Sequence, residues 1–415
     1  MSLSPTARPT SVDRRARVAV ALLFLTNGAL FANLIPRYPE IKAALELSNA
    51  TYGLAVAAFP AGAITAGLAV APLLRRFGSA QVAVAGTLLT SVGVFLAGVS
   101  PTLPLLVAAL FAAGAMDAFT DVAQNAHGLR VQRRYGRSII NSFHAVWSVG
   151  AVLGGVMAAG AIALSVPLGV HLGVTAVLFS AVALVVRRWC LPGLDSEPDP
   201  VPDAAEAAGA RGVGRLSGRT VAVLAALVLI AIGGTLVEDA GSTWAAVYLS
   251  GGSLGAAAEI AAFGFVALVG AQFVGRTVGD RMVDRLGQRT VARLGGLLIA
   301  AGMGLALAFP SVPGTIAGFA AAGFGTATLV PAAMQQADEL PGLRPGTGLT
   351  VVSWLMRLGF LASPPLVGLV ADATSLRMGL LVLPLAGILV IALSGVLRPR
   401  RAPAPAARET EGATA

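Results

Sequence analysis

Two carboxylates stand four residues apart inside an apolar stretch of the chain. Asp117 and Asp121, followed by Asn125, lie in the segment Gly114–Gly128, at the end of an apolar run that starts near Leu103. A carboxylate at the centre of a bilayer costs about 2.5–3.5 kcal/mol on insertion scales. Acidic residues kept inside a membrane usually face a cavity and mark the path of an ion or a substrate. The segment therefore predicts a site that handles protons or solutes inside a membrane.

The spacing of the two acids places them on one face of a helix, with Asn125 one turn further on. Burial and a nearby like charge both favour the neutral form of a carboxyl group, so at least one of them can hold a proton near neutral pH. A proton carrier needs such a group. The alternative is a polar cluster that closes a gate near one end of the helix.

His144 is the second candidate for proton chemistry. At 1.5 Å per residue it lies about 9 Å into the apolar segment 138–163, close to the predicted depth of Asp121. If the two side chains are in contact, the imidazole titrates in the physiological range. The alternative is a structural His144 whose ring nitrogens hydrogen-bond to the backbone or to Asn125. Trp147 shares the face of His144 and either lines a cavity or packs against lipid.

Further charges lie within apolar segments of the second half. Arg357, near Trp354, must be paired or hydrated, and its planar fork suits a carboxylate of the protein or of an anionic substrate. Glu238 and Asp239 are predicted near the outer end of the segment 219–240, where neighbouring positions cannot share one helix face. Three uncharged side chains are candidates for binding substrate: Asn27, Asn33 and Gln272. The alternative is that each forms a hydrogen bond to a neighbouring helix.

Composition decides the class of protein that must position these side chains. The 415 residues are 56% hydrophobic and 12% charged, with a mean hydropathy of +0.80, whereas ordinary globular domains are about a quarter charged. One cysteine, Cys190, excludes an intrachain disulfide and a cysteine metal cluster, and the three dispersed histidines offer no metal motif. We expect no cofactor, no metal and no enzymatic activity. The net charge of +9 is scattered between apolar segments, which disfavours nucleic-acid binding.

Twelve apolar segments approach the roughly 20 residues that a spanning helix needs. The chain therefore predicts an all-α membrane protein with no cleavable signal peptide. The predicted spans are 18–36, 52–74, 81–99, 103–126, 138–163, 168–187, 219–240, 257–278, 290–309, 313–335, 348–370 and 376–397.

Orientation follows from the placement of lysine and arginine, which collect on the cytoplasmic side. The 29 Lys+Arg fall on one side of the predicted spans except for Arg37, Lys42 and Arg377 on the other side and Arg357 within a helix. Both termini and the central linker are then cytoplasmic, which requires an even number of spans. The predicted parts are an arm (1–17), a six-helix bundle (18–187), a linker (188–218), a second six-helix bundle (219–397) and a tail (398–415).

The two halves look like repeats. A constant offset of 209 residues superimposes three glycines of the first half on three of the second: Gly78 on Gly287, Gly114 on Gly323, and Gly150 on Gly359. Repeated halves are how many secondary transporters build alternating access, with the site between them near the midplane. The same offset maps Asp117 onto Thr326 and Asp121 onto Val330, so the acid pair belongs to the first half alone.

The loop Gly279–Arg289 resembles the cytoplasmic loop signature of the major facilitator superfamily, with its DRxGxR part intact. In the first half the equivalent loop carries Arg75 where the superfamily usually has Asp. The resemblance covers about residues 17–397 and implies a fold of two six-helix bundles that rock about a central site. It also implies a gating role for Arg75, Arg76, Gly78, Asp284, Arg285, Gly287 and Arg289.

Within that superfamily the chain is similar to the fucose-permease-like branch and its uncharacterised bacterial inner-membrane members. Asp121 with Asn125 resembles that branch's acid followed four residues later by Asn. Phe143–Gly150 resembles its FHxxxSxG segment. Glu238 with Trp244 and Tyr248 resembles its acidic–aromatic stretch. The resemblance implies that Asp121 is a proton-coupling group. It leaves the substrate unnamed, because no complete sugar-contacting set matches.

These observations predict a proton-coupled secondary transporter of a small solute, acting as a monomer in the inner membrane. The predicted proton-coupling residues are Asp121, Asp117, His144 and Glu238. The predicted substrate-binding residues are Asn27, Asn33, Asn125, Trp147, Gln272, Trp354 and Arg357.

Several alternatives stay open. One is a proton-driven multidrug or metabolite exporter, although Gly150, Gly154 and Gly155 match the exporter signature only loosely and lack its proline. Another is a non-transporting sensor or scaffold on the same fold, for which the linker and tail offer no signalling domain. An ATP-driven pump is excluded because GxxxxGK[ST] does not occur and Lys42 is the only lysine. Import and export are not distinguished.

Overall fold

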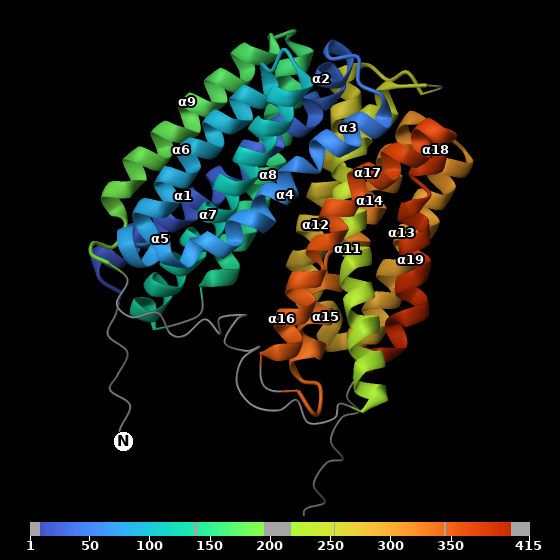
Figure 1. Ribbon diagram of the computed structural model, residues 1–415. Coiled ribbons are helices and arrows are strands. Elements are labelled where there is room, and N and C mark those ends of the chain that lie inside the picture. The colour runs from blue at the N-terminus through green and yellow to red at the C-terminus, as the bar shows by residue number, and fades with distance from the viewer. Residues whose placement is uncertain (1–8, 137–138, 195–216, 253, 344–345, 400–415) are drawn as a thin grey trace, which may run out of the picture.

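A computed structural model describes residues 9–136, 139–194, 217–252, 254–343 and 346–399. Within these ranges the chain forms helices and turns and no strand. The helices form two bundles that lie side by side, the first half blue to green and the second yellow to red (Figure 1). The first eight residues, most of the predicted linker (195–216), Arg344 and the tail from residue 400 lie outside the described residues.

The first bundle follows the predicted order of six spans. Its helices are α1 (Ser11–Leu34), α2 (Tyr38–Ala44), α3 (Asn49–Val56), α4 (Ala58–Ala66), α5 (Val70–Phe77), α6 (Ser79–Gly98), α7 (Leu103–Tyr135), α8 (Ile140–Ala163) and α9 (Leu168–Val186). Three short 3-10 turns join or end them: η1 (Ile35–Arg37), η2 (Gly67–Ala69) and η3 (Arg187–Trp189).

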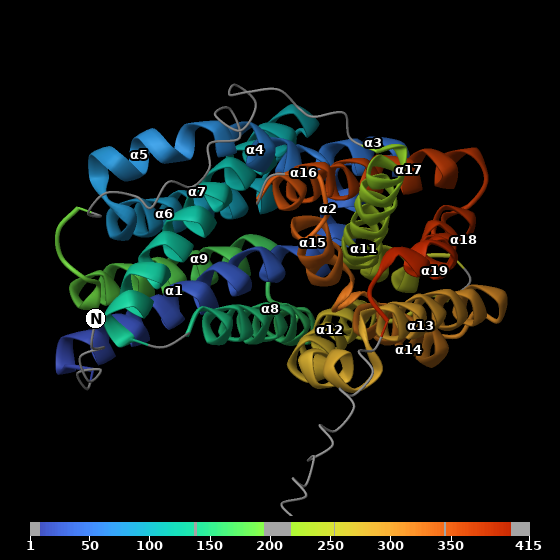
Figure 2. The same ribbon diagram turned by 90° about the horizontal axis from the view of Figure 1, so that it is seen from below.

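The second bundle repeats the arrangement with more breaks. Its helices are α11 (Gly218–Ser250), α12 (Ala258–Leu286), α13 (Gln288–Ala308), α14 (Val312–Thr326), α15 (Leu329–Asp338), α16 (Thr347–Leu355), α17 (Arg357–Ala373), α18 (Leu376–Gly379) and α19 (Val382–Leu393), followed by η4 (Ser394–Val396). Seen along the bundles, α8 lies beside α12, and α3 lies beside α17 (Figure 2).

Eleven helical stretches of the described chain are long and apolar enough to cross a membrane, and a bent pair makes twelve. The pair is Asn49–Ala66 with Val70–Phe77, which meet at 60° where one continuous span, 52–74, was predicted. The predicted spans 313–335 and 348–370 are broken as well. The first divides into α14 and α15, and the second divides at Met356.

Four predicted spans stop well short of the ends of their helices. α7 continues to Tyr135 rather than 126, α11 to Ser250 rather than 240 and α12 to Leu286 rather than 278, and α1 begins at Ser11 rather than 18. Hydropathy falls where polar residues begin, but a helix continues as long as its backbone and polar side chains find partners. At the start of α1, Thr10 and Asp13 form a capping box, in which each side chain accepts a hydrogen bond from the other's backbone N–H.

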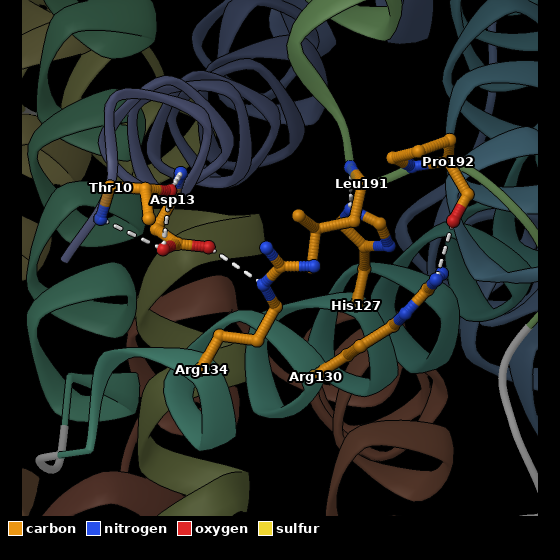
Figure 3. A network of polar contacts seen from close by, with 7 residues as sticks. All are labelled: Thr10, Asp13, His127, Arg130, Arg134, Leu191 and Pro192. Carbon is orange, nitrogen blue, oxygen red and sulfur yellow. Dashed lines mark hydrogen bonds and ion pairs between the residues drawn. The ribbon is translucent and has the colours of Figure 1, made fainter. Parts of the chain in front are cut away.

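Polar contacts on the last turns of α7 join three parts of the first bundle (Figure 3). Arg134 Nε lies 2.7 Å from Asp13 Oδ1 at the start of α1. His127 Nε2 accepts the backbone N–H of Leu191 at 3.1 Å, and Arg130 donates to the carbonyl of Pro192. The start of α1 and the chain after α9 are therefore tied to one helix end, so this end of the bundle can move as one body.

The repeat appears in the backbone. Gly78 and Gly287 follow α5 and α12 with nearly identical dihedrals, φ +80° and +81°, in the left-handed region that favours glycine. A Cβ on Gly114 would lie 1.9 Å from the carbonyl oxygen of Phe59, and one on Gly323 would lie 2.0 Å from that of Leu268. Gly323 and Leu268 each lie 209 residues after Gly114 and Phe59. Equivalent helix pairs of the two bundles therefore touch at equivalent glycines.

Alanine at either contact glycine should destabilise the protein. The new Cβ of Gly114→Ala or Gly323→Ala meets a backbone carbonyl, which cannot rotate away, and overpacking of this kind costs about 1–3 kcal/mol. Thermal unfolding in detergent should show a lower midpoint for both variants. Gly160→Ala is the matched control, because its Cβ would meet nothing within 4 Å. Equal midpoints for all three variants would contradict the packing described.

Candidate functional site

Asn27 of α1 joins the acid-bearing face of α7 to α8. Its Nδ2 donates to Asp117 Oδ1 at 2.6 Å, and its Oδ1 accepts the indole N–H of Trp147 at 2.8 Å. An indole nitrogen can only donate, so Trp147 fixes the amide oxygen on its own side and turns the NH2 group toward Asp117. Three residues predicted separately from the sequence therefore form one hydrogen-bonded group.

Gln124 connects the two carboxylates, and the sequence analysis did not single it out. Its Nε2 lies 3.5 Å from Asn27 Oδ1 and 3.4 Å from Asp121 Oδ1, and its side chain is fully buried. Its Oε1 is buried with no hydrogen-bond partner among the described residues. Gln124 stands three residues after Asp121 and seven after Asp117, so helical spacing alone could have placed it on their face.

Asp121 has partners on its own helix and on both bundles. Asn125 Nδ2 donates to its Oδ1 at 3.1 Å and to its backbone carbonyl at 2.8 Å. The carboxylate also interacts electrostatically with His144 of α8 and with Arg357 of α17. The interaction with Arg357 crosses from the first bundle to the second. The sequence offered the pairing of Asp121 with His144 as one of two alternatives and left the partner of Arg357 open.

The second bundle adds an ion pair that the sequence analysis did not predict. Arg276 Nη2 of α12 lies 3.6 Å from Glu238 Oε2 of α11, and Arg276 also interacts electrostatically with His144. Arg276 was grouped with the cytoplasmic arginines although the predicted span 257–278 contained it, and in the structure it lies within α12, which runs on to Leu286. A row of ionisable side chains thus runs from Asp121 past His144 to Arg276 and Glu238, with an acid at each end. The side chains of Asp121, His144, Arg276 and Arg357 remain exposed although they lie in membrane-spanning helices.

Glu238 and Asp239 lie well inside α11, not near its outer end as expected, because the helix continues to Ser250. They point to different surroundings, as adjacent helix positions must. Glu238 faces Arg276, whereas Asp239 faces Ser363 of α17 and the tyrosines Tyr38 and Tyr52.

Three predicted substrate-binding residues lie outside this group. Asn33 Oδ1 accepts from His171 Nε2 at 2.9 Å and its Nδ2 donates to the Ala29 carbonyl, so its amide is engaged within the first bundle. Gln272 is buried, with no partner for its Nε2 in the part of the chain that the structure describes. Trp354 is 55% exposed, one turn before Arg357. Their roles in binding stay predictions.

The two bundles meet closely at the end that carries α3 and α17. The Asp372 carboxylate accepts the backbone N–H groups of Asn49 and Ala50 at 3.0 and 2.7 Å. A Cβ on Gly368 would lie 2.3 Å from the carbonyl oxygen of Asn49, and one on Gly53 would lie 2.3 Å from that of Pro364. This end of the molecule, which we call the α3–α17 end, is therefore closed by backbone-to-backbone packing.

The predicted gating residues lie at the opposite end, called here the linker end. Arg289 donates to the carbonyls of Leu397 and Gly395 and so holds the chain after α19. Arg75, Arg76, Asp284 and Arg285 are exposed, and among the described residues no hydrogen bond or ion pair joins them across the bundles. Gly78 and Gly287 supply the positive φ that each turn requires.

The donor set suits protons and hydrogen-bonding solutes better than metals. Among the described residues no three His, Cys, Asp or Glu side chains gather into a metal site. Cys190 lies apart, and burial raises the pKa of its thiol to about 11 despite the opposing effect of Arg187. Such a thiol stays protonated and unreactive at neutral pH.

Comparison with known proteins identifies the chain's relatives. The sequence profile of the Major Facilitator Superfamily matches residues 20–283 and 271–414. The uncharacterized transporter y4wD of Sinorhizobium fredii is 29% identical over 381 residues, which cover 91% of this chain and 97% of that protein. Membrane protein MosC of Rhizobium meliloti is 28% identical over 377 residues, which cover 91% of this chain and 88% of that protein.

A solved structure shows the same fold at low sequence identity. The D-xylose–proton symporter superimposes with a TM-score of 0.70 and 17% identity, covering 92% of this chain and 97% of its own. At that level of identity the likeness extends to the fold alone.

Proposed function

The chain belongs to the Major Facilitator Superfamily of membrane transporters, and on that premise we propose that it carries a small solute in a step coupled to protons. Asp121, with Asp117 and His144, takes and releases the proton. The two bundles rock about the site between them, and one polypeptide contains all of its parts, so the protein works as a monomer.

The electrostatic interaction of Asp121 with Arg357, across the two bundles, carries this proposal. Asp121 belongs to the first bundle and Arg357 to the second, so any movement of one bundle against the other changes their separation. A guanidinium near a carboxylate favours its ionised form, and removing that cation favours the protonated form. The interaction therefore makes the proton affinity of Asp121 depend on which end of the transporter is open.

Charge placement supports an orientation in a bacterial inner membrane. Arg75, Arg76, Arg130, Arg285 and Arg289 stand at the linker end, and cationic residues collect on the cytoplasmic side. With both termini cytoplasmic, the α3–α17 end faces outward. The described conformation is then closed outside, and in it Arg357 favours loss of the proton from Asp121 toward the cytoplasm.

The substrate site in this proposal lies between the Asn27–Trp147 pair and the partners of Asp121, which are Asn125 and Arg357. Asn27 and Trp147 hold each other and Asp117, so a solute that hydrogen-bonds to either changes the surroundings of a proton-carrying acid. Arg357 offers a bidentate partner for an acceptor on the solute, in competition with Asp121. Solute and proton thus share partners, which is what coupling requires.

Reconstituted vesicles test the proposal. A ligand is first identified by a thermal-shift screen of sugars, organic acids and drugs, since binding to the native state raises apparent stability. Vesicles with an imposed pH gradient should then accumulate or expel that ligand, and dissipating the gradient with a protonophore should stop net movement. Equal ligand movement with and without the gradient would contradict proton coupling.

A further inference from the structure

Asp239 is half-buried, with its Oδ2 atom fully buried, and the proposed transport step does not use it. Its neighbours are Ser363, within hydrogen-bonding reach of the carboxyl, and Tyr38 and Tyr52, which interact with it electrostatically. The two tyrosines come from the first bundle, and Asp239 and Ser363 come from the second. The carboxyl therefore lies at the junction of the bundles, on the side toward the α3–α17 end.

Several polar atoms around Asp239 are buried without a partner. Within the described residues no hydrogen bond reaches Asp239 Oδ2, the Tyr38 hydroxyl or the Trp244 indole nitrogen. The Tyr52 hydroxyl is already committed, since it donates to the Thr243 carbonyl at 2.8 Å. The rings of Tyr38, Tyr52 and Trp244 pack edge to face, with centroids 5.7 and 4.8 Å apart, and cover the site.

No cation balances this carboxyl among the described residues. The charged groups on the elements packed against α11 bind other residues or lie away from Asp239. Arg276 pairs with Glu238, Arg357 interacts with Asp121, Arg37 pairs with Glu40, Asp372 binds the start of α3, Asp338 accepts from Gly346, and Lys42 lines a pocket at the outer surface. The nearest charge is that of Glu238, which has the same sign.

We propose that Asp239 is a second proton-binding site, filled when the α3–α17 end closes and emptied when it opens. A carboxylate buried without a cation or a full set of donors is costly, and protonation removes that cost. Opening this end draws Tyr38 and Tyr52 away with the first bundle and lets water reach the carboxyl. Asp239 then ionises and releases its proton to the outside.

This proton differs from the one on Asp121. It enters and leaves through the same end, so it is not carried across the membrane. It instead links closure of the outer end to external pH: acid favours the closed form, and alkali favours the open form. The inference rests on the proposed orientation and alternating access, but not on proton coupling at Asp121.

Distance measurements between spin labels on the two bundles test the proposal. Ala43→Cys on α2 and Met378→Cys on α18 stand beside Lys42 and Arg377, which line opposite sides of a pocket of about 430 Å³ between the bundles. Cys190→Ser removes the native thiol. In lipid nanodiscs the parent should gain a longer-distance population as pH rises, by up to about tenfold per pH unit, the limit for one linked proton.

Asp239→Asn should keep the short distance at every pH, because its side chain cannot ionise. Asp280→Asn is the matched control, because it neutralises an exposed acid near the end of α12 of the same bundle, and it should keep the pH response. If Asp239→Asn does not fold, Asp239→Ser provides a second neutral side chain. An unchanged pH response in the neutral variant, or no response in the parent, would overturn the proposal. A separate assay of protons moved per solute should be unaffected by Asp239→Asn, which separates this site from Asp121.

Discussion

Replacement of Asp121 by asparagine should abolish solute accumulation driven by a pH gradient while leaving downhill exchange in place. The amide keeps the size and the hydrogen bonds with Gln124 and Asn125 but cannot carry a proton. One coupled proton supports at most about tenfold accumulation per pH unit, and the variant should show none. Initial rates in reconstituted vesicles, with and without the gradient, measure both properties.

Asp280→Asn is the matched control for Asp121→Asn. Asp280 lies exposed near the end of α12, so its replacement removes an acid without touching the site. It should accumulate solute like the parent protein. If Asp121→Asn accumulates solute at the parent level across a range of pH, Asp121 does not carry the proton.

Leucine at Gly368 should hold the α3–α17 end open. Its Cβ would lie 2.3 Å from the carbonyl oxygen of Asn49, and the rest of the side chain has no room while α3 and α17 touch. Overpacking costs about 1–3 kcal/mol. At 1.4 kcal/mol per factor of ten, this shifts the balance toward the open form by about fivefold to a hundredfold.

Net transport by Gly368→Leu should fall by a similar factor, because the cycle needs that end to close. The label pair at positions 43 and 378 should show the long distance even at low pH. Gly160→Leu changes a glycine with open space around it and should transport normally. A short label distance in Gly368→Leu would show that the helices do not close by this contact.

The fold was largely predictable because lipid imposes simple rules on sequence. Spans of about 20 apolar residues and repeated glycines predicted the bundles, and the contacts of Gly114 with Phe59 and Gly323 with Leu268 confirm the repeat. Helix ends were less predictable. α7 and α11 continue through polar residues because those residues find partners, such as Leu191 for His127, that are remote in sequence.

The site was predictable one helix face at a time. Spacing placed Asp117 and Asp121 together. Asn27 was predicted to bind substrate, with a bond to a neighbouring helix as the alternative, and it donates to Asp117 of α7. The rotation of each helix against the next is set by packing, which a single sequence does not display. Arg276 was therefore assigned to the cytoplasm and Glu238 preferred over Asp239, although the two acids have separate surroundings.

Infrared difference spectroscopy in lipid membranes tests the assignment of the transported proton to Asp121 most directly. The carbonyl stretch of a protonated carboxyl group should appear on acidification of the Asp239→Asn protein, in which the second proposed site is silent. Other carboxyl groups contribute to this band, so one component of it should disappear when Asp121→Asn is added, while the rest of the band remains. A band that persists unchanged in the double variant would show that Asp121 does not hold the proton.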